Sequence, residues 1–536
     1  MSQDQPRRSP VLRALNSVWP GCLPAADAAG PGGIAIVALI VSALCLALSP
    51  LPWWLAFGTA AAAAAVAWRV VDRTPLWYAA TIGLPVPQGI FLARLSMADL
   101  FILPSILRDA PRWLLGRLPT SSLVVPLLLL VAISAVATVV GYVRLGQWSR
   151  WGIVNKDIGL LLQVATLFAV STRLRSFEDI RRVAQWFVIG VSLGNVGMLL
   201  GVVVRLFGIP NPLYQARLYG WMGQPTITGG LLLVAAMIEL GSLASGPRAG
   251  ERRALRWINL WLIGLSLALT VSRSAWLAVA GGAALLLMVQ WVRRRRLAAR
   301  PRLSHVVVTS VWFLVPCVFL GNVLSANLLA GRPVVSADRR AELKSELITK
   351  CLQRPEQDWC GPVLKVAQEG NYRVAEDELP SSLMMPDVVM NARGLNDRIA
   401  IVRAGWEQYT RDWQSVLMGI GLGTFYATSE PSFGLPLIIH NTFAWYLFEF
   451  GPIGLAIVLW IWLRTARNIW TATMQHEEAA ALALGLTAAF GAFAVFCVFN
   501  EGFYQRQFWL VMVLADRLAA LPKTKVDLAV SAATAA

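Results

Sequence analysis

Apolar runs recur along almost the whole chain and are separated by short polar turns. A helix needs about 20 apolar residues to cross the hydrocarbon core of a bilayer. Of the 536 residues, 57% are hydrophobic and 14% are charged, whereas a soluble domain has about 45–50% and about 25%. The sequence therefore predicts an all-α polytopic membrane protein. Its twelve predicted transmembrane helices are residues 33–50, 52–71, 122–142, 157–173, 183–206, 225–245, 256–272, 274–292, 305–327, 438–463, 479–499 and 505–520.

Basic residues gather in every second turn between the predicted spans. Lys and Arg accumulate in cytoplasmic turns and set the orientation of a membrane protein. The even number of spans then leaves two cytoplasmic tails, 1–32 and 521–536, with an uncleaved first span. The net charge of +17 follows from this bias, so no nucleic-acid partner is expected. The turns expected to face the cytoplasm lie around residues 173–182, 248–256, 293–302 and 464–467.

Residues 328–437 are the one long polar stretch between predicted spans, and we expect them to form a periplasmic loop. From Gly331 to Pro436 the loop has 12 Lys and Arg against 14 Asp and Glu, a net charge of −2, which leaves +19 for the remainder. This asymmetry supports an outside location for the loop. The loop holds Cys351 and Cys360, and the oxidising periplasm would permit a disulfide between them.

Residues 398–413 of this loop have the pattern of an amphipathic helix. Apolar side chains recur there every three or four residues, at Ile399, Val402, Trp406, Tyr409 and Trp413. The glycine-rich sequence GIGLG follows at 419–423. It lacks the strand, turn and helix that surround a dinucleotide-binding fingerprint. We therefore expect a flexible turn rather than a nucleotide site.

The stretch 78–108 is apolar but is interrupted by Gly83, Pro85, Pro87 and Pro104. Because proline ends or kinks a helix, we expect a re-entrant or interfacial pair of segments here. Such a pair adds either no crossing or two crossings to the topology.

The predicted span that begins near residue 438 carries unusual polar groups. His440, one of three histidines in the chain, stands with Asn441 at its mouth, and Glu449 lies inside the apolar run. Gly451-Pro452 is expected to break the helix. Ionisable groups at membrane depth are costly and usually mark function. Structural alternatives are a hydrogen-bonded histidine at a span end, and a Glu449 that pairs with an arginine or, when protonated, donates a hydrogen bond.

Four arginines are expected on the same outer side as His440. Arg273 follows Ser272 at the start of a span, Arg217 stands among interfacial aromatic residues, and Arg398 and Arg403 lie on the amphipathic helix. Each has a structural alternative. Arg273 could be an anchor whose charged head reaches the interface, and the two loop arginines could belong to a solvated helix face.

These residue types suit a phosphorylated ligand. A guanidinium stays charged and matches phosphate oxygens with its fork of donors, so a lipid-linked diphosphate at the membrane surface is a natural ligand. In glycosyl transfer from such a donor, fixed cations would stabilise the leaving diphosphate, and a histidine that titrates near neutral pH could act as the base. The sequence has no carboxylate pair and no metal-ligand cluster, so no metal and no cofactor are expected.

At these residues the chain resembles the O-antigen ligase and polymerase superfamily of bacterial envelope glycosyltransferases. The ligases show His followed by Asn, Ser or Gln, then nine residues, Gly, two residues, and Gly, Thr or Tyr. His440-Asn441, Gly451 and Gly454 meet this pattern, and Arg273–Leu277 meets the family's Arg-x-x-x-Leu. The segment DRIAIVRAGWEQYTRDWQSVLMGIGLGTF resembles the amphipathic helix and Gly-rich turn before the histidine, and Arg217 matches a further family arginine. The resemblance covers residues 205–460.

The resemblance implies a metal-independent, inverting glycosyltransferase with a GT-C-like helical architecture in the bacterial inner membrane and an active site facing the periplasm. The donor would be a glycan on undecaprenyl diphosphate, and the acceptor a glycolipid or glycan. Arg217 and Arg273 would hold the diphosphate, and His440 would activate the acceptor hydroxyl. Arg398 and Arg403 would line the cavity from the loop, which would meet the acceptor. Further expected substrate-binding residues are Asn441, Ser272 and Glu449.

Three functions remain open from the sequence. The first is a ligase that joins a preassembled polysaccharide to lipid A–core, which the motif fit favours. The second is a polymerase that joins repeat units on the same lipid carrier. The third is a transporter or flippase that moves the lipid-linked glycan without transfer. A transporter predicts that His440 is dispensable, and it often shows internal repeats, of which the sequence has none that is clear.

Overall fold

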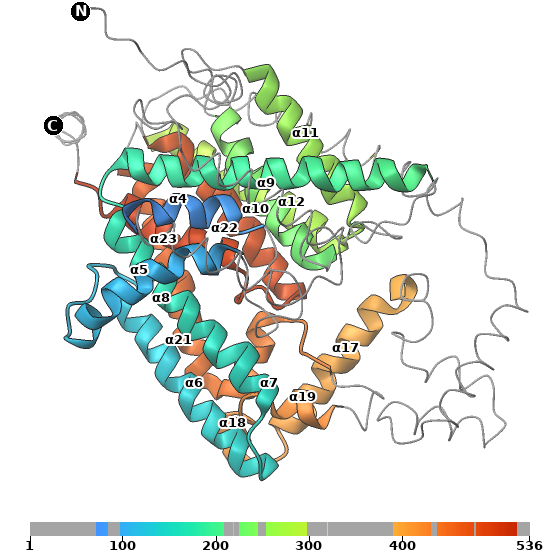
Figure 1. The fold of residues 1–536 in the computed structure, drawn as a ribbon. Coiled ribbons are helices and arrows are strands. Elements are labelled where there is room, and N and C mark those ends of the chain that lie inside the picture. The colour runs from blue at the N-terminus through green and yellow to red at the C-terminus, as the bar shows by residue number, and fades with distance from the viewer. Residues whose placement is uncertain are drawn as a thin grey trace, which may run out of the picture. The chain divides into compact units, whose positions relative to one another are not determined.

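The computed structural model describes residues 71–83, 97–207, 218, 225–244, 253–296, 313, 319, 390–429, 437–475 and 479–522. Within these residues all regular elements are helical (Figure 1). The helices are η1 (Val71–Arg73), α4 (Thr74–Thr81), α5 (Met97–Leu114), α6 (Val124–Leu145), α7 (Arg150–Gly152), the π-helical segment η2 (Ile153–Asp157), α8 (Ile158–Arg173), α9 (Phe177–Leu206), α10 (Pro225–Ala244), α11 (Arg253–Leu269), α12 (Arg273–Arg296), α17 (Met390–Tyr409), α18 (Trp413–Met418), α19 (Thr424–Thr428), α21 (Thr442–Gln475), α22 (Ala480–Phe499) and α23 (Arg506–Ala519).

Seven segments of the described chain are long and apolar enough to cross a membrane. This confirms a helical, multi-pass membrane protein. Helices α11, with 17 residues, and α23, with 14, also coincide with predicted spans but are shorter. The predicted spans 33–50, 52–71 and 305–327 and the Cys351–Cys360 pair lie wholly or almost wholly outside the described residues, so the count of twelve stays a prediction. The seven segments are Val124–Leu145, Arg150–Arg173, Phe177–Val204, Pro225–Ala244, Arg273–Arg293, Thr442–Met474 and Ala480–Phe499.

The chain divides into two compact units. Unit 1 comprises residues 1–131, 154–323 and 457–536, and unit 2 comprises residues 132–153 and 324–456. The two units therefore share the long helices α6 and α21, which each begin in one unit and end in the other.

Helices α10, α12 and α22 form the centre of unit 1 and approach one another through glycines. A Cβ at Gly241 would lie 2.3 Å from the backbone nitrogen of Gly485, and a Cβ at Gly282 would lie 2.6 Å from the carbonyl oxygen of Ala488. Small residues allow such close approach, and helix association within a membrane relies on the resulting van der Waals contact.

The described parts of the stretch 78–108 belong to two helices, α4 and α5, that pack together in unit 1, whereas Pro85 and Pro87 lie outside the described residues. The Trp77 and Phe101 rings meet with centroids 5.6 Å apart, and the Thr74 and Ser105 hydroxyls are hydrogen-bonded. The expectation that Pro104 interrupts the second segment is wrong, because α5 continues through Pro104 and Pro111. Its first turn, in which Asp99 lies, contains neither proline.

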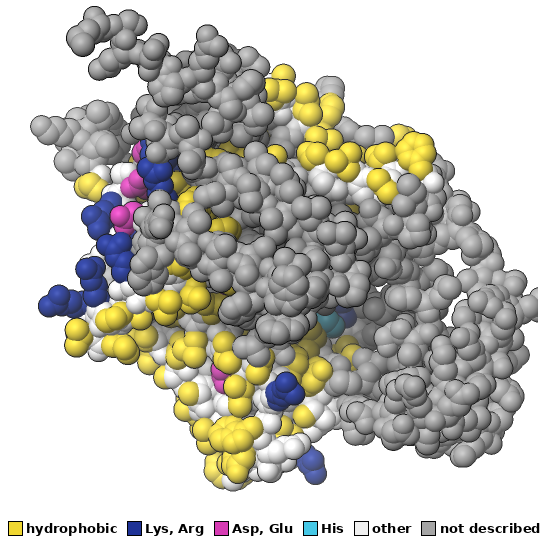
Figure 2. Space-filling model, viewed as in Figure 1, with side chains coloured by type: hydrophobic (Ala, Val, Ile, Leu, Met, Phe, Trp, Pro, Cys, Tyr) yellow, Lys and Arg dark blue, Asp and Glu magenta, His cyan; other side chains and the backbone are white. Residues whose placement is uncertain are grey.

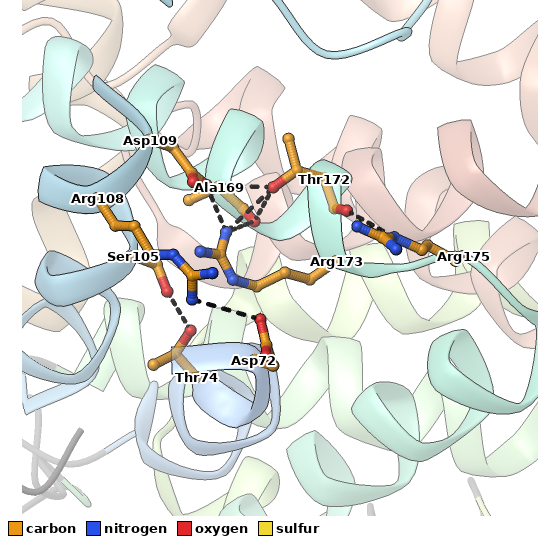
Figure 3. A network of polar contacts seen from close by, with 9 residues as sticks. All are labelled: Asp72, Thr74, Ser105, Arg108, Asp109, Ala169, Thr172, Arg173 and Arg175. Carbon is orange, nitrogen blue, oxygen red and sulfur yellow. Dashed lines mark hydrogen bonds and ion pairs between the residues drawn. The ribbon is translucent and has the colours of Figure 1, made fainter. Parts of the chain in front are cut away.

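Ion pairs join the two ends of α5 to different neighbours. At its C-terminal end, Asp109 accepts a hydrogen bond of 2.6 Å from Arg173 at the end of α8, and Arg108 pairs with Asp72 just before α4 (Figure 3). At its N-terminal end, Asp99 pairs with Arg506 at the start of α23. The start of α4 and the end of α5 therefore lie at the same end of unit 1, the end that carries Arg173. Whether the two segments add no crossing or two crossings, the later spans keep the same orientation.

The amphipathic helix of unit 2 differs from the prediction at both ends and in its buried face. Helix α17 begins at Met390 rather than Arg398. Helix α17 ends at Tyr409 rather than Trp413, because the Asp412 carboxylate accepts a 2.6 Å hydrogen bond from the Ser415 N–H and caps the separate helix α18. Among the side chains of α17 whose burial is described, from Arg398 onward, Ile401 and Tyr409 are buried, with Gly405 between them, whereas Trp406 is half exposed.

Candidate functional site

The His440 segment leads directly into α21. Asn441 is the residue before the helix, and its Oδ1 accepts a 2.9 Å hydrogen bond from the Ala444 N–H. This is the preferred chemistry of a helix N-cap, so the side chain expected to bind substrate also fixes where the helix begins. His440, which is partly exposed, is thereby held immediately before the first turn of α21.

The predicted break in this helix is confirmed. Gly451 has φ 71° and ψ −175° inside α21, followed by Pro452. This backbone region is essentially restricted to glycine. The first part of α21, residues 442–450, is therefore a short separate helix that carries Asn441 at one end and Glu449 at the other.

The Gly419–Gly423 turn is closely packed, and the expectation of a flexible turn is wrong. All three glycines have positive φ, and Ile420 and Leu422 between them are buried. Backbone N–H groups of Ile420 and Gly421 donate to the carbonyl oxygens of Phe448 and Glu449, at 2.7 and 3.2 Å. The glycines therefore serve tight backbone contact with α21 rather than mobility.

Gly419 and Gly451 are each other's neighbours in this contact. A Cβ at Gly419 would lie 2.5 Å from the Glu449 carbonyl oxygen and 2.7 Å from the Gly451 nitrogen. A Cβ at Gly451 would lie 2.7 Å from the Leu417 carbonyl oxygen and 2.9 Å from the Gly419 nitrogen. Because all these atoms belong to the backbone, neither position has room for a side chain.

Helix α6 supports the same turn from its other side. The Leu422 N–H donates to the Ala137 carbonyl oxygen at 2.8 Å, and a Cβ at Gly421 would lie 2.3 Å from the Gly141 nitrogen. The turn is thus fixed between α6 and the first part of α21, and it fixes the segment that begins at His440.

Glu449 is almost fully buried, and its carboxylate accepts a 3.0 Å hydrogen bond from the Gly423 N–H. Its own carbonyl oxygen accepts from Gly421. Both contacts bind the Gly-rich turn to α21. Of the two sequence interpretations, these contacts favour the structural one, and the substrate-binding role of Glu449 stays a prediction.

The two arginines of α17 lie on different faces of the helix. A Cβ at Gly405 would lie 2.8 Å from the Phe448 ring and 3.4 Å from Ile439, so this face packs against the histidine segment. Arg398, two turns earlier, shares that face and is partly buried. Arg403 points elsewhere, is 80% exposed and pairs with Glu407 at 3.1 Å. Arg398 is therefore the better candidate for contact with a ligand beside His440.

Arg273 belongs to unit 1, where it is exposed at the first position of α12. The link before it is strained, since Val271 is the one non-glycine residue of the described chain with a positive φ, at 53°. Such outliers cost about 1–3 kcal/mol and cluster at functional sites. Ser272 is buried, and its hydroxyl lies 3.2 Å from that of Ser274, so it is engaged within the protein.

Arg217 lies outside the described residues, but the next residue is described. Leu218 is buried, and its N–H donates to the Leu269 carbonyl oxygen at 2.9 Å. Leu269 ends α11, directly before the link that leads to Arg273.

The sequence interpretation missed a polar cluster at the same end of α12. Asn500, after α22, donates to the Ser274 hydroxyl at 2.9 Å. The next residue, Glu501, pairs with Lys156 of the π-helical segment η2. Lys156 is fully buried, and its ammonium lies 4.5 Å from the centre of the Tyr504 ring. The available signal was that Lys156 and Glu501 each lie in a turn between two predicted spans, but their pairing is a tertiary contact.

A protein-family model described as O-antigen ligase matches residues 258–459. This region belongs to the O-antigen ligase and polymerase superfamily. A search of the curated proteins finds no match to the chain. The superfamily region extends from α11 into α21 and includes Arg273, both arginines of α17 and the whole His440–Gly454 pattern.

The family match supports an O-antigen ligase or polymerase function, and the candidate spans support a multi-pass membrane protein. The region leaves out Arg217 and Lys156, and it also leaves out α6, whose Gly141 supports the Gly-rich turn.

Proposed function

We propose that the protein is an O-antigen ligase that transfers a polysaccharide from undecaprenyl diphosphate to a hydroxyl of lipid A–core at the periplasmic face of the bacterial inner membrane. The observation that carries this proposal is the family match over 258–459, within which the complete His440–Gly454 pattern falls. The active site proposed here needs no metal and inverts the configuration of the transferred sugar.

His440 acts as the base. The acceptor oxygen forms a bond to the anomeric carbon of the donor sugar from the side opposite the diphosphate, and the carbon–oxygen bond to the diphosphate breaks. The hydroxyl proton passes to the imidazole, and the bonding electrons leave with the diphosphate on its lipid carrier. A histidine suits this role because its pKa lies close to neutral pH. Its support is the rigid segment formed by Asn441, Gly451 and the Gly-rich turn.

Arg273 and Arg217 stabilise the leaving diphosphate, whose negative charge grows as the glycosidic bond breaks. Arg273 is exposed at the N-terminus of α12, where the helix dipole also favours an anion. The buried bond from Leu218 to the end of α11 supports the grouping of Arg217 with Arg273. Arg398 binds the donor or acceptor from α17, with Arg403 in a peripheral role.

The first experiment is a gel profile of surface and carrier-linked glycans from a deletion strain complemented with wild type, His440→Ala or His476→Ala. His476 follows the last residue of α21 and is the matched control, because it is expected near the opposite, cytoplasmic end of the same span. We expect rescue by wild type and His476→Ala, and none by His440→Ala despite normal membrane insertion. In the deletion strain, long chains stranded on the carrier with bare core outside identify a ligase.

The other outcomes select the alternatives. Accumulation of single repeat units on the carrier would identify a polymerase, which performs the same chemistry on a different acceptor. Full rescue by His440→Ala would exclude the histidine as base and favour a transporter.

A second experiment compares Arg273→Lys with Arg295→Lys, at opposite ends of α12. We expect Arg273→Lys to bind the donor poorly and to transfer slowly, because a point charge cannot replace the guanidinium fork. Arg295 is the control, since its guanidinium lies 3.8 Å from the Trp291 ring centre, away from the proposed site. Wild-type donor affinity in Arg273→Lys would remove Arg273 from the diphosphate site.

A further inference from the structure

Helix α18 carries apolar side chains that are exposed in the described part of the chain. Trp413 is 70% exposed and Leu417 is 54% exposed, and Val416 and Met418 of the same helix are also exposed. Only Ser415 of its six residues is buried. An amphipathic helix in a soluble loop normally turns its apolar side chains toward the protein, so those of α18 require another apolar environment.

The position of α18 within unit 2 indicates which environment that is. Arg144, in the last turn of α6, pairs with Asp412, the N-cap of α18, at 3.3 Å. The Gly-rich turn that follows α18 is bonded to Ala137 of the same helix. Helix α18 is therefore fastened at both ends to the C-terminal part of α6, which is a candidate membrane span.

The exposed surface of α6 is itself apolar and continues toward α18. Val136, Val139 and Val143 of α6 are exposed within unit 2. Figure 2 shows apolar side chains gathered over the region where Figure 1 places α6. Because the outside of a membrane span contacts lipid, the apolar surface of α18 continues a lipid-facing surface.

Aromatic and charged groups at this junction have the composition of a membrane–water interface. The Tyr142 and Trp148 rings stack with centroids 4.4 Å apart, and Trp148 is more than half exposed. Arg144, two residues after Tyr142, pairs with Asp412. Exposed Trp and Tyr next to charged groups are typical of the headgroup level of a bilayer.

We infer that α18 and the turn at 142–148 lie in the outer headgroup region of the membrane and bind its lipid surface. The family resemblance implies instead that the loop meets the acceptor. Helix α18 leads into the Gly-rich turn that holds the first part of α21, so the lipid contact would set the height of His440 relative to the bilayer. The inference concerns lipid contact and does not depend on the proposed glycosyl transfer.

The test uses single-cysteine variants, Leu417→Cys and, as control, Glu407→Cys, in a protein whose six native cysteines are replaced. Glu407 is also well exposed and lies on α17 of the same unit. Each cysteine is labelled with an environment-sensitive NBD dye, and the protein is reconstituted in nanodiscs of phospholipid with or without nitroxide-labelled lipid. Iodide then reports exposure to water.

We expect the dye at 417 to emit at shorter wavelength than at 407, to be quenched by the nitroxide lipid and to be protected from iodide. Two results would overturn the inference. Quenching by iodide as strong as at 407, without quenching by lipid, would mean that α18 lies in water. Protection from both quenchers would mean that protein, for example a second copy of the chain, covers it.

Discussion

Substitution of Gly451 by alanine tests whether the Gly-rich turn and the broken helix form one rigid unit. An alanine at φ 71° and ψ −175° is strained by about 1–3 kcal/mol. Its Cβ would also lie 2.7 Å from one backbone atom and 2.9 Å from another, and such overpacking costs about 1–3 kcal/mol more. The expected loss is therefore about 2–6 kcal/mol of unfolding free energy, against about 5–15 kcal/mol for a whole domain.

The control is Gly146→Ala in the same unit. Gly146 also has a positive φ, of 66°, but a Cβ there would meet nothing within 4 Å. It should cost only the strain of a left-handed residue, about 1–2 kcal/mol. Thermal unfolding in detergent, followed by circular dichroism, should show a clearly lower midpoint for Gly451→Ala than for Gly146→Ala. Equal midpoints would refute the argument from backbone contact.

The double variant Gly419→Ala/Gly451→Ala sharpens the same test. Each of these glycines leaves no room for a Cβ beside the other. Once the first alanine has forced the two backbones apart, the second should cost less, so the two losses should not add. Strict additivity would mean that the two glycines are required for unrelated reasons.

Two further predictions concern the polar contacts of each unit. Lys156→Met and Arg256→Met each leave a buried carboxylate unpaired, and each should lower the free energy of unfolding by about 3–5 kcal/mol. Only Lys156→Met should also weaken donor binding per folded molecule, because its partner Glu501 adjoins Asn500, which holds the start of α12. Equal donor affinity in both variants would contradict this. The second concerns Asp412, whose pKa is held below its ordinary value of 3.8 by hydrogen bonds from the Ser415 N–H and hydroxyl, and by Arg144. A lowered folded-state pKa stabilises the fold above the unfolded-state value and loses that contribution as the pH falls through the folded-state value, so wild type should unfold at a higher temperature than Asp412→Asn at neutral pH, and the difference should disappear in acid. A difference that stays constant with pH would show that the charge of Asp412 contributes nothing.

The spans were predictable because their determinant is local. The predicted 225–245 and 479–499 agree closely with α10 and α22, since the length of an apolar run is what a bilayer selects. The break at Gly451-Pro452 was predictable for the same reason, because proline acts on its own helix. His440 and Arg273 could be singled out by their rarity and position, and the structure adds what holds them.

Contacts between distant segments could not be predicted from patterns. The buried face of α17 is centred on Gly405. A search for apolar periodicity passes over glycine, but here the missing side chain leaves room for the Phe448 ring. The end of α17 had a local signal, because Asp412 and Ser415 have the spacing of a helix N-cap. The apolar repeat that continues to Trp413 predicted a longer helix instead. The pairing of Lys156 with Glu501 joins two distant turns, and neither turn alone reveals its partner.

The packing of the Gly-rich turn against α6 limits which segments homologous proteins can exchange. Gly421 and Leu422 lie within the superfamily region 258–459, whereas Gly141 and Ala137 lie outside it. Exchanging that region alone between two homologous proteins would part the turn from the helix surface that receives it. A chimera should keep its histidine segment in position only where both parents have a glycine-sized residue at position 141, and natural substitutions at 141 and 421 should occur together.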